Sequence, residues 1–146
     1  MRAGTAQGFT LIELMIVLAI IAGLVAMALP SYESAVARGQ LAEGLSLATQ
    51  AKAAMVEFHA EHGRWPASNA EAGLPDTIRG QYVSAVELVA APAGAIRISF
   101  GGAKAHAALQ QQAMLLQASA DQGAILWTCK PAGPGFKSEF LPSSCR

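Results

Sequence analysis

The chain carries little charge and few of the residue types that build active sites. Of its 146 residues, 14% are Asp, Glu, Lys or Arg, and ten acidic side chains balance ten basic ones. Without an excess of Lys and Arg, the composition does not favour electrostatic binding of nucleic acid by the chain itself. The sequence also lacks a Ser/His/Asp arrangement, paired catalytic carboxylates and a phosphate-binding glycine loop. We therefore expect no catalytic residues and no cofactor.

Potential metal ligands are equally scarce, with three histidines and two cysteines in the chain. His59 and His62 are spaced to share one face of a helix, but two ligands are too few for a stable site. Neither cysteine has a His or Cys neighbour at ligand spacing. We therefore expect no metal site, and we interpret the two histidines as solvated or capping residues near a helix end.

One segment contains almost no polar residues. From Phe9 to Leu29 every residue is apolar, Ala or Gly, except Thr10 and Glu13. As a helix, these residues are about 31 Å long, which matches a hydrocarbon core of about 30 Å. The segment can therefore cross a bilayer. Glu13 is the anomaly, because a carboxylate at the centre of a membrane span costs about 2.5–3.5 kcal/mol and normally has a partner.

The residues before this span do not form an ordinary signal peptide. The stretch 1–8 contains one cation, Arg2, and no apolar core. A secretory signal places its apolar region before the cleavage site, whereas the small residue Gly8 precedes the span here. Cleavage after Gly8 would create an ammonium group at Phe9, near Glu13. The carboxylate could pair with the amine of its own chain or with that of a neighbour, and the second arrangement would set the axial register of packed helices.

The sequence Gly-Phe-Thr-Leu-Ile-Glu at 8–13, followed by the apolar run, resembles the processing site and N-terminal helix of a type IV pilin. The resemblance implies a prepilin leader at 1–8, cleavage after Gly8 by a prepilin peptidase, and N-methylation of Phe9. It identifies Glu13 as the assembly glutamate and 9–29 as the transmembrane and assembly half of the helix. A plain single-pass anchor, with Glu13 at the membrane interface, is the alternative.

The same resemblance implies a place and a function. The subunit would be stored in the inner membrane, and the inner-membrane pilus assembly machinery would add it to a homopolymeric fimbrium at the cell surface. Adhesion to host or surface receptors, twitching motility, and DNA uptake or nucleic-acid binding would be properties of the filament. We expect a major subunit because the head is small. A minor pilin, a type II secretion pseudopilin and a membrane-anchored exported binding protein are the alternatives.

The residues after the span predict an amphipathic helix over 30–62. Pro30 is expected to break or kink the helix where it begins, and pilins typically carry a proline here. Gly63 supplies the C-terminal stop. One helix face is apolar, with Leu41, Leu45, Ala48 and Met55 at its centre, widened by Leu47, Ala51, Ala54 and Phe58. The opposite, polar stripe consists of Glu43, Ser46, Gln50, Glu57 and Glu61.

A globular head follows over 63–146. Its first part, 63–81, is rich in turn residues and predicts a surface connection with Trp65, Leu74 and Ile78 as anchors. The region 82–129 then shows strand patterns, with turns at Pro92–Gly94 and Asp121–Gly123, and a loop or helical turn at Ala103–Gln112. The predicted strands lie at 82–90, 96–100, 114–119 and 124–129. Four antiparallel strands packed on a long amphipathic helix make an α+β fold.

The two cysteines close the chain. In an exported domain, Cys129 and Cys145 most simply form a disulfide, worth about 3 kcal/mol for a loop of this length. A disulfide-bounded loop at the C-terminus is also common in pilins. We expect Trp127 in the core or at its rim beside the disulfide. We expect Phe136, Phe140 and Leu141 to anchor the loop 129–145. The loop is interpreted either as a contact surface, through Lys130, Lys137 and Arg146, or as a plain solvated loop.

Overall fold

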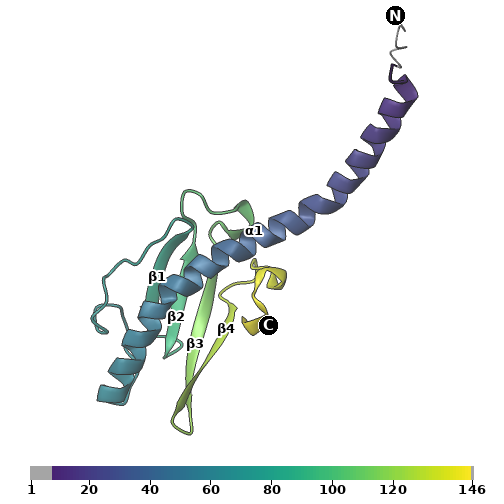
Figure 1. Cartoon of the computed structure of the whole chain (residues 1–146). Coiled ribbons are helices and arrows are strands. Elements are labelled where there is room, and N and C mark those ends of the chain that lie inside the picture. The colour runs from purple at the N-terminus through teal and green to yellow at the C-terminus, as the bar shows by residue number, and fades with distance from the viewer. Residues whose placement is uncertain (1–7, 146) are drawn as a thin grey trace, which may run out of the picture. The chain divides into compact units, whose positions relative to one another are not determined.

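The computed structural model describes residues 8–145. Apart from Gly8, the predicted leader lies outside the described residues, as does Arg146. One long helix, four strands and three single-turn 3-10 helices follow each other along the chain (Figure 1). Their bounds are α1 Leu11–His62, β1 Val83–Val89, β2 Ala95–Phe100, η1 Ala107–Leu109, β3 Ala113–Asp121, β4 Ala124–Pro131, η2 Ser138–Phe140 and η3 Ser143–Cys145.

The long helix does not end at Pro30. α1 runs for 52 residues and holds Pro30 in its interior. Proline costs about 3 kcal/mol inside a helix, but helix-forming segments flank it on both sides. The Ser31 hydroxyl also donates to the carbonyl of Ala28 at 2.8 Å. The alternative that Pro30 breaks the helix is therefore wrong for the isolated chain, whereas a kink at Pro30 and loosening of this segment inside a filament stay predictions.

The described chain divides into two compact parts between Glu33 and Ser34. In the first part, every residue from Gly8 to Glu33 is exposed. By length and composition, α1 is apolar enough at this end to cross a membrane. The second part begins at Ser34 and contains the remainder of α1, the sheet and the hydrophobic core.

The strands form a single antiparallel sheet in the order β1-β2-β3-β4, which confirms the predicted α+β fold. The β3–β4 hairpin turns at Gln122 and Gly123, whose φ angles of 45° and 85° are those of a type I′ turn. β4 runs to Pro131, two residues beyond the predicted end. Proline is tolerated there because β4 is an edge strand, and no partner strand needs the missing N–H.

The core lies between the sheet and residues 37–55 of α1. Small residues on the helix allow the strands to approach closely. A Cβ added to Gly44 would lie 2.8 Å from Ile98 Cγ2 and 3.0 Å from Phe100 Cζ. The predicted apolar face is therefore confirmed at Leu41, Ala48 and Met55. The largest fully buried side chains are those of Phe100, Leu41, Met55, Ile96, Ile98, Leu109, Met114, Leu116, Val83, Val86 and Pro66.

Two polar residues of α1 depart from the predicted helix pattern. Glu43, assigned to the solvated stripe, is half-buried, and its carboxylate accepts the backbone N–H groups of Gln81 at 2.6 Å and Tyr82 at 2.8 Å. Gln40 is buried and accepts the N–H of His106 at 2.7 Å. Both side chains complete the hydrogen bonds of loops that are distant in sequence, and helical periodicity cannot predict such contacts.

The connection after α1 has no helix or strand of its own, as predicted. Leu74 and Ile78 are buried as expected, and Ile78 forms an isolated bridge with Val86 of β1. Trp65 is half-buried and packs its ring on Gly94, where an added Cβ would lie 3.1 Å from two ring carbons. The predicted anchors thus hold the connection against one edge of the sheet.

Candidate functional site

The largest uncovered apolar surface of the described chain is the first half of α1. Nearly all of its large side chains are more than half exposed, with Leu11 at 79% and Met27 at 77%, and Phe9 just before the helix is 80% exposed. Apolar surface in this amount is stable only when lipid or other helices cover it. The predicted assembly segment is therefore accessible from all sides of the helix in the isolated subunit.

Glu13 forms a capping box with Thr10 at the start of this surface. Thr10 precedes the first helical residue, and its hydroxyl accepts the N–H of Glu13 at 3.3 Å. The Glu13 carboxylate in turn accepts the N–H and the hydroxyl of Thr10 at 3.5 and 3.3 Å. The Thr-x-x-Glu spacing is the sequence signature of this motif, and it could have been found from the sequence alone.

The capping box positions the Glu13 carboxylate and leaves it with further acceptor sites for hydrogen bonds. Both contacts with Thr10 involve one oxygen, Oε2, whereas an ionised carboxylate offers about four lone-pair sites. The helix N-terminus further favours a negative charge at this place. Glu13 can therefore keep its intrachain contacts and still accept a cation from a neighbouring chain. Gly8 and Phe9, the residues on either side of the predicted cleavage point, are both exposed next to it.

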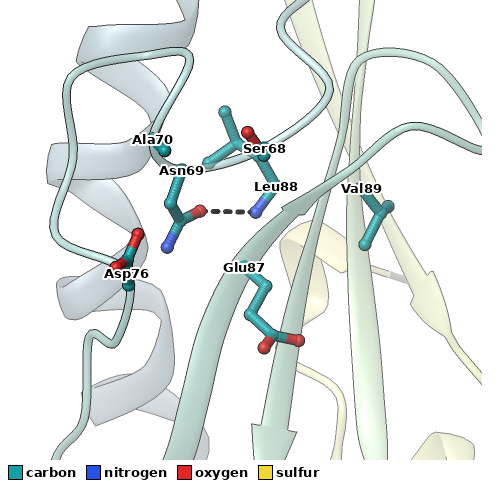
Figure 2. Close-up of a pocket in the computed structure, with 7 residues that line it drawn as sticks. All are labelled: Ser68, Asn69, Ala70, Asp76, Glu87, Leu88 and Val89. Atoms are coloured by element: carbon teal, nitrogen blue, oxygen red, sulfur yellow. Dashed lines mark hydrogen bonds between the residues drawn. The ribbon is translucent and has the colours of Figure 1, made fainter.

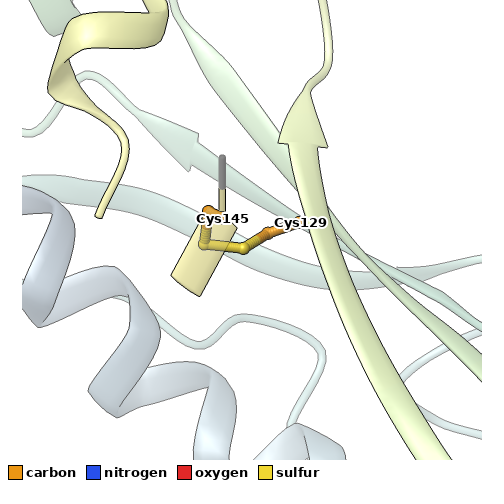
Figure 3. The surroundings of a disulfide bond; sticks show 2 residues. All are labelled: Cys129 and Cys145. Carbon is orange, nitrogen blue, oxygen red and sulfur yellow. A yellow bond between two sulfur atoms is a disulfide. The ribbon is translucent and has the colours of Figure 1, made fainter. Parts of the chain in front are cut away.

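The disulfide joins β4 to the C-terminal turn η3, as the sequence predicted. Cys129 and Cys145 have Cα atoms 4.9 Å apart (Figure 3). The tail between them is anchored through the buried side chains of Phe136, Phe140 and Leu141, which confirms these three predicted anchors. Arg38 of α1 adds a polar anchor, because its guanidinium donates to the carbonyl of Glu139 at 2.9 and 3.1 Å.

Beside the disulfide, a cavity of about 420 Å³ that is open to solvent lies between α1 and the sheet. Trp127 lines it as a half-buried residue at the rim of the core, and the Lys52 ammonium lies 5.1 Å from the centre of its ring. A cation at this distance from an indole is attracted by the ring. Lys52 of the helix and Trp127 of β4 therefore contact each other across one side of this cavity.

A second cavity, of about 220 Å³, lies between the connection and β1 (Figure 2). Asn69 at its edge is buried. Its amide oxygen accepts the N–H of Leu88 in the edge strand β1 at 2.7 Å and so takes the place of a neighbouring strand. Its amide nitrogen donates to the carbonyls of Val86 and Pro75 at 3.0 and 3.1 Å. This side chain was missed from the sequence, where it looked like an ordinary turn residue. It holds the connection on the sheet and leaves no free donor for a ligand.

The end of α1 is held by stacked rings and one ion pair. His59 stacks on Trp65 with ring centres 3.9 Å apart, and His62 stacks on Phe58 at 4.1 Å. The hydrogen bond from the Ala67 N–H, and then the Arg64 guanidinium, hold the pKa of Glu71 below its ordinary value. Within residues 8–145, no group of three or more His, Cys, Asp or Glu side chains could hold a metal ion.

The comparisons with known proteins agree with this geometry. Residues 37–146 match the family model described as pilin, a bacterial filament protein, and residues 5–29 match the prokaryotic N-terminal methylation motif. The chain is 41% identical to fimbrial protein EcpC of Eikenella corrodens over 141 residues, which cover 96% of this chain and 90% of that protein. It is 36% identical to type IV major pilin protein PilE1 of Neisseria gonorrhoeae over an alignment of 157 positions, which covers 96% of this chain and 93% of that protein.

A more distant relative, fimbrial protein Q of Moraxella bovis, is 33% identical and is covered to 97% of its length. The matches therefore extend over both the apolar half of α1 and the head. Together with the exposed apolar helix, the four-stranded sheet and the C-terminal disulfide, they show that this chain belongs to the type IV pilin family.

Proposed function

We propose that this chain is the major subunit of a type IV pilus and that it polymerises through the exposed apolar half of α1. The observation that carries the proposal is the complete exposure of residues 8–33 in a chain whose head has its own hydrophobic core. Lipid covers this surface while the subunit is stored in the inner membrane. Neighbouring helices replace the lipid when the assembly machinery adds the subunit to the filament.

Processing creates the end of the helix that assembly needs. A prepilin peptidase cleaves after Gly8 and methylates the new terminus at Phe9, which leaves a cation beside Glu13. In the filament, the Glu13 carboxylate of one subunit pairs with the Phe9 ammonium of the next. Because a charge buried among apolar helices is costly unless paired, only the register that brings these groups together is stable.

The filament as a whole carries the biological activity. We infer adhesion and twitching motility, with the exposed loop 129–145 as the surface offered to host or surface receptors. DNA uptake is a further filament-level function of the same kind. The close likeness to a protein named as a major pilin supports a major subunit over a minor pilin or a secretion pseudopilin.

Sheared surface filaments test the proposal directly. The main protein band should be this chain, and its intact mass should correspond to a mature chain that begins at methylated Phe9. A minor place for this chain in the filament, or a mass that retains residues 1–8, would contradict the proposal.

The substitution Gly8→Val should leave the full-length precursor in the membrane, because a branched side chain crowds the peptidase at the cleaved bond. Gly4→Val is the matched control, since it adds the same side chain to the leader away from that bond. Normal cleavage of the Gly8→Val precursor would show that the peptidase does not act there.

A further inference from the structure

The sheet has two edges, and the structure protects them unequally. The β1 edge is covered by the connection, through the bond from the Val86 N–H to Ile78 at 2.9 Å and the contacts of Asn69. Among the described elements, η3 contacts β4 near the C-terminal end of the strand, where the disulfide joins Cys129 to Cys145. The N-terminal half of β4 has no such cover among the described residues (Figure 1).

The register shows which backbone groups point outward from this half of β4. Ala118 donates to Gly94, and Phe100 donates to Gln112, so the even-numbered residues of β3 face β2. The odd-numbered residues of β3 therefore face β4, where Ser119 lies opposite Leu126. It follows that Leu126 exchanges hydrogen bonds with β3, whereas the N–H and C=O groups of Ile125 and Trp127 face away from the sheet.

The side chains along the same edge carry no charge. From Ala124 to Cys129 there is no acidic or basic residue, and an uncharged edge strand is a template for pairing with another strand. Leu126 is 53% exposed and is the only large apolar residue from Ser34 onward, within the described chain, that stands exposed. It lies on the face of the sheet opposite α1, whereas the half-buried Trp127 lines the cavity beside the helix.

We propose that the edge segment Ala124–Thr128 pairs antiparallel with the same segment of a second copy of this chain, centred on Leu126. This register brings Ile125 of each copy opposite Trp127 of the other as a hydrogen-bonded pair, so the outward groups of both are satisfied. The two Leu126 side chains meet as a non-hydrogen-bonded pair, with Cα atoms about 4.5 Å apart. The four strands of each copy then form one sheet of eight strands.

Charge complementarity supports a second copy as the occupant. Exposed Asp121 lies beyond one end of the uncharged segment and exposed Lys130 beyond the other. Antiparallel pairing centred on Leu126 places Lys130 of each copy opposite Gln122 of the other, one residue from Asp121. Parallel pairing would place like charges side by side instead, and like charges in register are destabilising.

This contact goes beyond the proposed polymerisation. A two-fold contact uses the same patch on both chains and closes on two copies, whereas a filament grows through two different, complementary patches. Pairing at β4 would therefore join two free subunits, or two filaments side by side, without extending either one. Loss of the contact should leave the assembly of single filaments unchanged.

The test uses opposite charges at residue 126 in the full chain, purified in detergent. A tagged chain should co-purify an untagged wild-type chain, and Leu126→Lys in both chains should weaken this capture about tenfold because like charges then lie opposite each other. Leu126→Glu in both chains should do the same. A tagged Leu126→Lys chain mixed with an untagged Leu126→Glu chain should recover the capture to about the wild-type level.

Ser119→Lys is the matched control, because Ser119 lies beside Leu126 on the same face but one strand in from the edge. It should leave capture unchanged, and thermal unfolding should show that all variants keep the folded head. Equal capture by all variants, no recovery in the Lys/Glu mixture, or an equal loss with Ser119→Lys would overturn the proposal. Filament yield from Leu126→Lys, measured separately, reports on the proposed polymerisation alone.

Discussion

The two halves of α1 belong to one continuous helix, yet the apolar side chains of the first half are exposed and many of those in the second half are buried. The half from Leu11 to Glu33 is the more apolar and is entirely exposed. The half from Ser34 to His62 is amphipathic, and its small and apolar residues form part of the core. Apolar composition alone therefore does not predict burial within a chain, because burial also requires a matching surface.

Only the second half has such a surface within its own chain. Its buried residues are spaced to face the sheet, and Gly44 permits close contact with Ile98 and Phe100. Its polar residues also bind loops of the head, as Glu43 does with Gln81. We therefore expect substitutions in the first half to change assembly without changing the stability of the head, and substitutions in the second half to do the reverse.

The largest effect should come from Glu13 in the first half. Glu13→Val should insert and be processed normally but should assemble poorly, because the carboxylate that sets the register is gone. Glu13→Asp should be intermediate because its side chain is one methylene shorter. Glu13→Lys should be worst because it places a second cation next to the Phe9 ammonium of the neighbouring subunit. Filament yield relative to membrane subunit level measures this, and wild-type yield from Glu13→Val with normal cleavage would rule out the pairing.

The next largest effect should come from the disulfide, which lies wholly in the head. Replacing both Cys129 and Cys145 with Ser should lower the free energy of unfolding by about 3 kcal/mol, because the unfolded chain gains the freedom of an open loop. Chemical denaturation in detergent should show this loss while the membrane level of processed subunit is compared in parallel. Free thiols at full stoichiometry in native filaments would contradict the bond.

Two glycines of the second half sharpen the comparison within one helix. Gly44→Leu should destabilise the head by about 1–3 kcal/mol, because the new side chain must displace Ile98 and Phe100. Gly39→Leu, the matched control, has nothing within 4 Å of its added Cβ and should be neutral or slightly stabilising through helix propensity. Thermal unfolding of the two variants should separate them, and equal melting temperatures would argue against close packing at Gly44.

The smallest effect should come from Glu71 beside the end of α1. Its pKa is lowered by the Ala67 N–H and by Arg64, so its charge contributes stability that is present at neutral pH. That contribution should be lost as the pH falls through the lowered pKa of the folded state. Glu71→Gln should therefore flatten the acid side of the stability profile slightly. A profile identical to the wild type would show that this ion pair contributes nothing measurable.

Much of the fold was readable from local patterns. The four strands appear within a few residues of their predicted places because alternating side chains and turn residues mark them, as at Gln122–Gly123. The end of β4 was placed too early because the sequence does not show which strand lies at the edge. The break predicted at Pro30 as one alternative was wrong because the helical segments on both sides outweigh the cost of the proline.

By itself, the sequence determined the apolar span, the anomalous charge of Glu13, the cysteine pair and the order of helix and strands. These features depend on residues close together in the chain, or on a covalent motif. The tertiary structure decided the roles of Glu43, Gln40 and Asn69, whose partners, apart from Pro75, lie 17 to 66 positions away. Burial of such polar groups is stable only when distant backbone atoms reach hydrogen-bonding distance, and only the folded chain brings those atoms together.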